Sequence, residues 1–233
     1  MTVLARQDQI AAGLSAVRTR IEQGCAAAGR DTAEVTLVVV TKTYPASDVE
    51  LLAAMGVRDV GENRDAEAVA KHAACAGLGL HWHFIGRLQS NKARSVARYA
   101  DVVHSVDRAS LIAPLGRGAR EAGRVVECLL QVSLDADPGR GGASAAQLSE
   151  LAAAVAAEDG LVLRGLMAVA PLRVEPYEAF RVLPVLRAHL LESHPSADLL
   201  SAGMSGDLEA ALACGATHLR VGTAVLGARP PLA

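Results

Sequence analysis

The run VTLVVVTKTYP, at residues 35–45, constrains the fold of this chain more than any other stretch. Its β-branched and aliphatic residues end abruptly in Thr41, Lys42 and Thr43. A short apolar run bounded by polar residues is typical of a strand that is buried on both faces, as in a parallel sheet. Because α/β folds carry their functional groups at the carboxyl ends of such strands, we expect Lys42 to lie at a functional site.

Lys42 has two interpretations. A partly desolvated amine has a lowered pKa, and its neutral form is a nucleophile that can form a Schiff base with an aldehyde. Alternatively, the stem of Lys42 lies along the strand end and its ammonium group reaches water. The chain contains only three lysines, Lys42, Lys71 and Lys92, and arginine supplies the other positive charges. Lysine at this position favours the nucleophile, since arginine does not lose its proton.

Strand and helix patterns alternate along the rest of the chain. Strands are predicted at residues 35–41, 58–61, 83–86, 102–106, 126–134, 163–169, 199–203 and 219–222. Helices are predicted at residues 3–29, 46–55, 64–76, 91–99, 108–122, 145–158, 176–193 and 207–214. Eight strands with intervening helices favour an α/β fold, a single (β/α)8 TIM barrel domain over residues 1–233 with an extra N-terminal helix. An open doubly wound sheet is the alternative.

The composition limits the partners of the chain. Its net charge of −2 and its 3% of aromatic residues provide neither a basic surface for nucleic acid or membranes nor a platform for stacking bases. Its four cysteines form no CxxC pair, which indicates reduced thiols. The N-terminus has no apolar signal region, and no stretch reaches the ~18 apolar residues of a membrane span. We therefore expect a cytoplasmic protein.

Two polar motifs follow predicted strands without defining a reaction. In GENR, Asn63 could reach the barrel mouth, and Glu62 is expected to complement a helix N-terminus. In HWHFIGRLQSNK, His81 and His83 share one strand face. A metal site there would lack a third ligand, so a pocket wall is the favoured interpretation.

His104 and Asp107, in the motif HSVD, could form an acid–base pair. No nucleophilic Ser or Cys motif accompanies them, so a structural role is favoured. The Gly-rich segment at residues 135–144 follows the fifth predicted strand and is interpreted as an ordinary loop rather than a lid.

Two motifs near the C-terminus predict a phosphate site. SAGMSGD, at residues 201–207, follows the seventh predicted strand, and RVGTAVLG, at residues 220–227, spans the eighth. Small residues let backbone N–H groups approach an anion, and hydroxyl groups add donors. The loops after strands seven and eight are the usual phosphate site of such barrels.

Combined with Lys42, this phosphate site predicts a site for pyridoxal 5′-phosphate (PLP). The aldehyde would bind Lys42, and Arg220 would face the ring nitrogen. The phosphate would bind Ser205, Gly222 and Thr223. On the residues alone, a barrel for another phosphorylated metabolite, with Lys42 as an electrostatic contact, is the alternative.

The sequence resembles the YggS/PROSC-like pyridoxal phosphate homeostasis proteins. The resemblance rests on VVVTKTYP, GENR, HFIGRLQSNK, HSVD, GLMAVAP, SAGMSGD and RVGTAVLGAR, which occur in the family's order from about residue 5 to residue 229. It implies a fold-type III barrel, like the N-terminal domain of alanine racemase, with the cofactor covalently bound to Lys42 as a Schiff base. The further cofactor contacts that it implies are Asn63, Ser201, Met204, Ser205, Arg220, Gly222 and Thr223.

The chain departs from the family pattern at three positions. Arg64 stands where a tyrosine is frequent, Ala202 stands where a methionine is frequent, and Arg87 occupies a variable position. None of these departures removes an implied cofactor contact, although Ala202 could loosen the floor of the pocket.

The resemblance implies a PLP carrier or regulator in vitamin B6 and amino-acid homeostasis, without catalytic turnover, whose partners would include PLP-dependent apoenzymes. Because the chain ends at Ala233, soon after the last barrel motif, we expect it to lack the β domain of fold-type III racemases and to be a monomer. An arginine at the ring nitrogen would also weaken the cofactor as an electron sink. The alternative is a small racemase or related enzyme that uses His83 or Tyr44 as its base.

Overall fold

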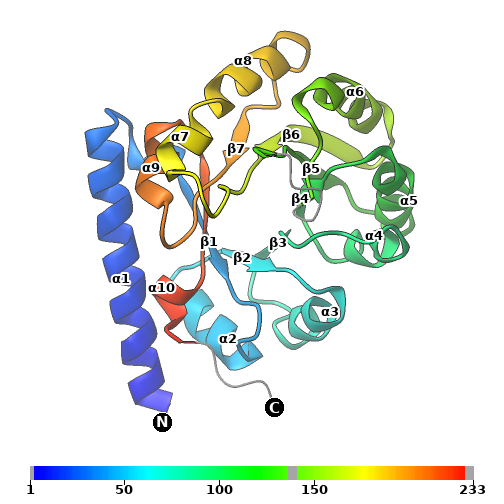
Figure 1. Cartoon of the computed structure of the whole chain (residues 1–233). Coiled ribbons are helices and arrows are strands. Elements are labelled where there is room, and N and C mark those ends of the chain that lie inside the picture. The colour runs from blue at the N-terminus through cyan, green and yellow to red at the C-terminus, as the bar shows by residue number, and fades with distance from the viewer. Residues whose placement is uncertain (1–2, 136–140, 229–233) are drawn as a thin grey trace.

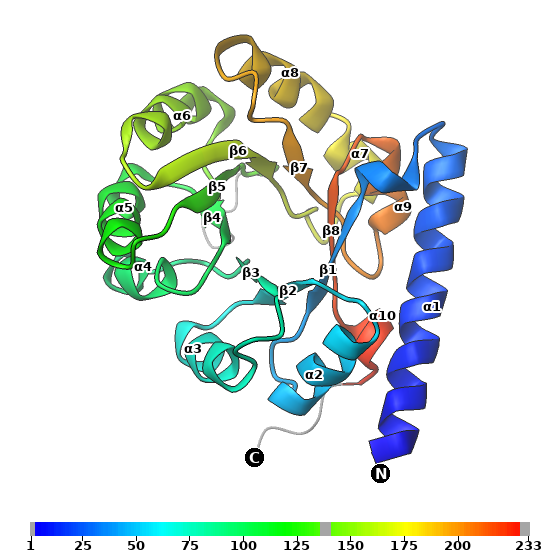
Figure 2. The same cartoon turned by 180° about the vertical axis from the view of Figure 1, so that it is seen from behind.

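The computed structural model describes residues 3–135 and 141–228. Eight parallel strands form a closed barrel in which β8 pairs with β1 (Figure 1; Figure 2 gives the view from behind). The strands are β1 Thr36–Val40, β2 Asp59–Glu62, β3 His81–Phe84, β4 Val102–Val106, β5 Val126–Gln131, β6 Leu161–Met167, β7 Leu199–Ser201 and β8 His218–Val221. This closure confirms the (β/α)8 prediction and excludes the open sheet.

Helices cover the outside of the barrel (Figure 1). They are α1 Val3–Ala27, α2 Ala46–Ala54, α3 Asp65–Ala74, α4 Ser90–Val96, α5 Ile112–Glu121, α6 Leu148–Ala157, α7 Pro176–Phe180, α8 Leu183–Ser193, α9 Leu208–Ala213 and α10 Thr223–Leu226. Short 3-10 turns lie at η1 Thr32–Glu34, η2 Ala109–Leu111 and η3 Ala145–Gln147. In the described part of the chain, no helix combines the length and the apolar character needed to cross a membrane.

The additional helix α1 lies on the outer side of α9 and α10 (Figure 1). Leu4, in its first turn, is 73% exposed, whereas the apolar residues at helical spacing further along are buried: Ile10, Leu14, Val17 and Ile21. Gly13 permits the close approach, because a Cβ at this position would lie 2.3 Å from the carbonyl oxygen of Val225 in α10. The helix thus supports α10, which begins at the predicted phosphate site.

Several predicted boundaries are wrong, for local physical reasons. The third strand ends at Phe84 rather than at residue 86, because the chain turns at Gly86, where a Cβ would lie 2.2 Å from the carbonyl oxygen of Asn63. The helix predicted at residues 176–193 divides into α7 and α8, since Pro184 favours the first turn of a new helix. Part of the loop predicted at residues 135–144 lies outside the described residues.

The cysteines are buried in the described structure and form no disulfide, as predicted: Cys25, Cys75, Cys128 and Cys214. Burial raises the pKa of each thiol, to about 12 for Cys128. These side chains therefore behave as small apolar residues of the core rather than as nucleophiles.

Candidate functional site

The predicted site residues come from four strands that are consecutive in the closed barrel, in the order β7-β8-β1-β2. Each residue lies at or near the carboxyl end of one of these strands: Lys42 after β1, Asn63 after β2, Ser201, Met204 and Ser205 at and after β7, and Arg220, Gly222 and Thr223 at and after β8. Residues that are up to 181 positions apart, 42 and 223, thus come to one edge of the barrel. The order of the strands therefore brings motifs that are distant in the sequence to one end of the barrel.

Lys42 lies in a turn rather than on the strand. The strand β1 ends at Val40, and Lys42 follows Thr41, whose N–H donates to the carbonyl oxygen of Gly61 at 2.9 Å. The Lys42 side chain is half-buried, and the next residue, Thr43, has a φ of 70°. The prediction that the strand runs to residue 41 is therefore wrong by one residue, while the place of Lys42 at the carboxyl end of β1 is confirmed.

Arg220 is a buried cation inside the barrel, with 4% of its surface exposed. Its Nη1 donates to the hydroxyl oxygen of Ser201 at 2.5 Å, and its Nη2 donates to the carbonyl oxygen of Ala168 at 2.8 Å. Burial lowers the pKa of the guanidinium to about 10, against an opposing effect of the Asp207 charge. The group consequently remains charged at neutral pH.

The groups around Arg220 at this end of the barrel are suited to a polar ligand. Among residues 3–135 and 141–228, no carboxylate lies at ion-pair distance from its guanidinium, and a buried charge of this kind is costly without a partner. Two buried oxygens at the same end of the barrel, Asn63 Oδ1 and Thr43 Oγ1, also have no hydrogen-bond partner in the described structure. The ring of PLP carries a hydroxyl group, which can donate to such oxygens, and a nitrogen, which can accept from a guanidinium.

A chain of hydrogen bonds leads from Arg220 through the barrel interior. Ser201 Oγ lies 2.9 Å from His104 Nδ1, and His104 Nε2 lies 2.9 Å from His83 Nδ1. The chain ends where His83 Nε2 lies 3.1 Å from Asp59 Oδ1. Its members come from β8, β7, β4, β3 and β2, so the chain links both sides of the barrel.

The two ends of the chain fix its direction. The guanidinium can only donate, and the Asp59 carboxylate can only accept. With both imidazoles neutral, the Ser201 hydroxyl donates to His104, His104 donates to His83, and His83 donates to Asp59. The opposite direction would place two acceptors, His83 Nε2 and the Asp59 carboxylate, against each other. The hydrogen of the Ser201 hydroxyl is therefore directed toward His104.

The pKa shifts are consistent with this arrangement. Burial lowers the pKa of His104 well below its usual range, and the neighbouring His83 and Arg220 add to this effect. Burial alone would raise the pKa of the Asp59 carboxyl, but the hydrogen bond from His83 and the nearby histidine charges hold it below its ordinary value. A neutral His104 and an ionised Asp59 are the states that the direction of the chain requires.

The predicted phosphate end is formed by the first residues of α10 and by the β7–α9 loop. Gly222 precedes α10 with no side-chain cap, and a Cβ there would lie 3.1 Å from the carbonyl oxygen of Val40. Ser205 is half-buried, and its carbonyl oxygen accepts from Arg20 of α1 at 2.9 Å. Met204 is 40% exposed, so only part of its surface packs within the protein. The cofactor contacts that the sequence predicts for this end of the site stay predictions: Met204, Ser205, Gly222 and Thr223.

The role predicted for Glu62 is wrong. Glu62 is not at a helix start but is the last residue of β2, with 1% of its surface exposed. Its Oε1 accepts from Thr41 Oγ1 at 2.6 Å and forms an ion pair with Lys71 Nζ at 2.5 Å. Asn63, next in sequence, is half-buried near the barrel mouth as predicted, and its contact with a cofactor stays a prediction.

The histidines of the two sequence motifs form contacts within the protein rather than a metal site or an acid–base pair. His81 and His83 both approach Asp59, at 3.6 Å and 3.1 Å, but the part of the chain that the structure describes contains no group of three side chains able to hold a metal ion. His104 does not contact Asp107, which forms an ion pair with Arg108 at 2.6 Å. The acid–base pair is thus excluded, and the structural interpretation of His104 is supported.

Sequence reasoning missed Asp59, His218, Glu67 and Lys71. His218 lies beside the hydrogen-bonded chain, with ring centroids 6.2 Å from His83 and 6.4 Å from His104. The available signal was a period of two, because His218 and Arg220 lie on the same face of β8. The predicted eighth strand began one residue too late to include His218.

Comparison with known proteins places these features in a family. The model of the alanine racemase N-terminal domain matches residues 13–230. The pyridoxal phosphate homeostasis protein of Escherichia coli is 42% identical, over 95% of this chain and 97% of its own length. The protein of the same description from Mycobacterium bovis is also 42% identical, over 96% of this chain and 94% of its own length.

Solved structures share the barrel. PipY of Synechococcus elongatus, whose structure contains bound PLP, is 36% identical and superposes with a TM-score of 0.79 over 94% of this chain and all of its own. An alanine racemase from Streptomyces lavendulae, 21% identical, superposes with a TM-score of 0.72 over 96% of this chain and 58% of its own. The racemase likeness concerns the fold alone.

Proposed function

Because the chain belongs to the family of pyridoxal phosphate homeostasis proteins, which share the fold of the alanine racemase N-terminal domain, we propose that it binds PLP where β7, β8, β1 and β2 end and holds it without consuming it. The observation that carries this proposal is that Lys42, Arg220 and the start of α10 lie at or near the carboxyl ends of the paired strands β1 and β8. When bound, PLP supplies an aldehyde that reacts with amines and a ring that can withdraw electrons.

In this proposal each end of the cofactor has its own partner. Lys42 forms a Schiff base with the aldehyde, because its amine is at the carboxyl end of β1 and its side chain is half-buried. Ser205, Gly222 and Thr223 bind the phosphate through hydroxyl and backbone donors. Arg220 donates to the ring nitrogen with a guanidinium that its contacts with Ser201 and Ala168 already hold in place.

The proposed lack of turnover follows from Arg220. A guanidinium has donors and no acceptor, so the ring nitrogen opposite it has to accept and cannot carry its own proton. An unprotonated ring withdraws electrons less effectively. The protein would thus store a reactive aldehyde and release it to partners, among them PLP-dependent apoenzymes, which suits a role in vitamin B6 homeostasis.

The structure does not favour the racemase alternative, because the two side chains considered as its base are already hydrogen-bonded within the protein. The hydroxyl of Tyr44 donates to the carbonyl oxygen of Gly227 at 2.7 Å, and Tyr44 is 3% exposed. His83 is 2% exposed, and both of its ring nitrogens have partners, in His104 and Asp59. Neither group is placed to exchange a proton with a substrate.

Covalent trapping tests the proposal. Borohydride reduction of the protein loaded with PLP, followed by peptide mass mapping, should place the pyridoxyl group on Lys42, and Lys42→Ala should abolish it. Lys92→Ala is the matched control, since Lys92 is exposed and lies 3.9 Å from Asp65. An adduct on Lys71 or Lys92 that survives in Lys42→Ala would contradict the assignment.

A further inference from the structure

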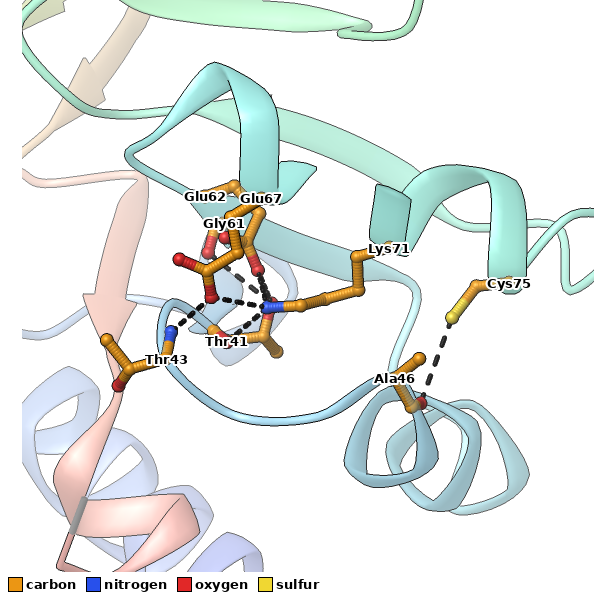
Figure 3. A network of polar contacts seen from close by, with 8 residues as sticks. All are labelled: Thr41, Thr43, Ala46, Gly61, Glu62, Glu67, Lys71 and Cys75. Atoms are coloured by element: carbon orange, nitrogen blue, oxygen red, sulfur yellow. Dashed lines mark hydrogen bonds and ion pairs between the residues drawn. The ribbon is translucent and has the colours of Figure 1, made fainter. Parts of the chain in front are cut away.

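The two peptide groups that flank Lys42 are held by one cluster of side chains, formed by the buried Glu62 and Lys71 and the half-buried Glu67 (Figure 3). On the N-terminal side of Lys42, the carbonyl oxygen of Thr41 accepts from Lys71 Nζ at 2.7 Å. On the C-terminal side, the N–H of Thr43 donates to Glu67 Oε1 at 2.5 Å. The Cα of Lys42 joins these two peptide planes, so the cluster restricts both backbone dihedrals of Lys42 and the direction of its Cα–Cβ bond.

Lys71 is fully occupied by this cluster. An ammonium group has three protons. The three acceptors within reach of Lys71 Nζ are the Thr41 carbonyl oxygen at 2.7 Å, Glu62 Oε1 at 2.5 Å and Glu67 Oε1 at 3.1 Å. The Lys71 side chain is 5% exposed. It therefore acts as a charged crosslink between α3 and the end of β1, and not as a second nucleophile.

The backbone of Thr43 supports the view that the turn is imposed on the chain. Among the residues that the structure describes, Thr43 is the one non-glycine residue with a positive φ, at 70°. A β-branched residue rarely adopts this conformation, which persists only where surrounding contacts hold it, often at functional sites. The hydrogen bond to Glu67 is such a contact, and it holds the peptide group immediately after Lys42.

We propose that Glu67 and Lys71, together with Glu62, are positioning residues that aim the amine of Lys42 at the cofactor. The proposal rests on the proposed Schiff base at Lys42. Glu67 is the informative residue, because its side chain is 27% exposed and only its Oε1 contacts Thr43 and Lys71. Lys71 is less suitable, since its removal would leave Glu62 as a buried carboxylate without a cation.

The test is a double-mutant cycle between Glu67→Ala and Lys42→Ala, read out as the dissociation constant of PLP in both backgrounds. With Lys42 present, Glu67→Ala should weaken PLP binding about tenfold and slow the borohydride-trapped labelling of Lys42 by a similar factor, as expected for a lost charge-assisted hydrogen bond. In the Lys42→Ala background, the same substitution should leave the weaker, non-covalent binding unchanged, because there is no amine to aim.

Two further variants make the cycle specific. Glu67→Gln keeps an oxygen for the Thr43 N–H, so its labelling rate should stay close to that of the wild type. Glu121→Ala is the matched control, since it removes a carboxylate that forms ion pairs with Arg94 and Arg98 on the surface. It should change neither binding nor labelling, and circular dichroism should show that the wild type and all five variants are folded.

The outcomes separate the two proposals. Equal weakening of PLP binding by Glu67→Ala in both backgrounds, or no weakening in either, would overturn the positioning role while leaving the Schiff base intact. The proposed function fails, whatever the effect of Glu67→Ala, if Lys42→Ala binds PLP as tightly as the wild type and borohydride reduction does not label Lys42 in the wild type.

Discussion

The guanidinium of Arg220 donates to the hydroxyl oxygen of Ser201 across 2.5 Å, and this contact joins the candidate cofactor site to the hydrogen bonds of the barrel interior. Through Ser201, the orientation of Arg220 depends on His104 and, beyond it, on His83. Each side chain in this series forms a hydrogen bond with the next, so the polar groups of the series are paired inside the barrel. The site is thus supported from the opposite side of the barrel.

Ser201→Ala should lower the free energy of unfolding by about 1–3 kcal/mol, because it leaves one Arg220 N–H and His104 Nδ1 buried without a partner. Urea unfolding of the protein without PLP measures this change. Ser205→Ala is the control and should change the free energy of unfolding by less than about 0.5 kcal/mol, since Ser205 is half-buried and does not belong to this chain of hydrogen bonds. Equal stability of the two variants would show that the Ser201 contacts carry no net energy.

The protein should lose stability as the pH falls from about 6.5 toward 4, because of His218. Burial lowers the pKa of this histidine to about 4, and the neighbouring His83, Arg164 and Arg220 act in the same direction, while Asp59 opposes them. Between these pH values the unfolded chain binds the proton and the folded chain does not, so acid favours unfolding. The loss from His218 should reach about 3 kcal/mol at most.

Urea unfolding at several pH values, for the wild type and His218→Asn, measures this contribution. The variant should show a flatter pH dependence over the same range, although His104, whose pKa burial also lowers, will still contribute. His189→Asn is the control, since His189 is exposed and 3.3 Å from Glu192, and it should follow the wild type. A variant curve parallel to that of the wild type would assign the acid sensitivity to other groups.

Replacing the hydroxyls of Ser205 and Thr223 together should weaken PLP binding by roughly 1–3 kcal/mol, which is the usual net value of charge-assisted hydrogen bonds. Equilibrium titration of the wild type and the Ser205→Ala, Thr223→Ala variant measures the change. Pyridoxal, which lacks the phosphate, provides the internal control and should bind both proteins equally. Equal affinities for PLP would place the phosphate elsewhere.

Much of the barrel could be predicted because several strands carry a local apolar run, such as TLVVV in β1 and VVHSV in β4. The fourth strand was predicted without error at residues 102–106, where all five residues are buried. Ends were less accurate where tertiary contacts decide them: β3 pairs Trp82 with Val60 and His81 with Asp59, so it begins two residues before its apolar pattern suggests. The ends of β3 are set by its partner strand rather than by its own residues.

The supports of the site could not be predicted in the same way. Lys71 and Glu62 are nine residues apart in sequence, on α3 and β2, and their ion pair depends on how that helix packs on the barrel. The rarity of lysine was an argument for Lys42 alone, although Lys71 is the more buried of the two. Rarity marks a special position, but it does not distinguish a nucleophile from a buried crosslink.

Arg220→Glu should increase slow conversion of bound PLP to its amine form when an amino acid is present in excess. Arg220 remains charged, with a pKa of about 10, and can only donate, so in the proposed site it would keep the ring nitrogen unprotonated. A carboxylate can accept a hydrogen bond and would favour the protonated ring, which withdraws electrons better. Pyridoxamine phosphate, quantified by chromatography and mass spectrometry, should thus accumulate faster in the variant than in the wild type.

Arg220→Lys is the matched variant for this experiment. It keeps a donor-only cation at residue 220, although its ammonium group lacks the fork that contacts both Ser201 and the Ala168 carbonyl oxygen. If the protonation of the ring controls inertness, Arg220→Lys should remain as inert as the wild type even though it binds PLP less tightly. If both substitutions raise the amine yield equally, the wild type owes its inertness to the position of the cofactor rather than to the charge of Arg220.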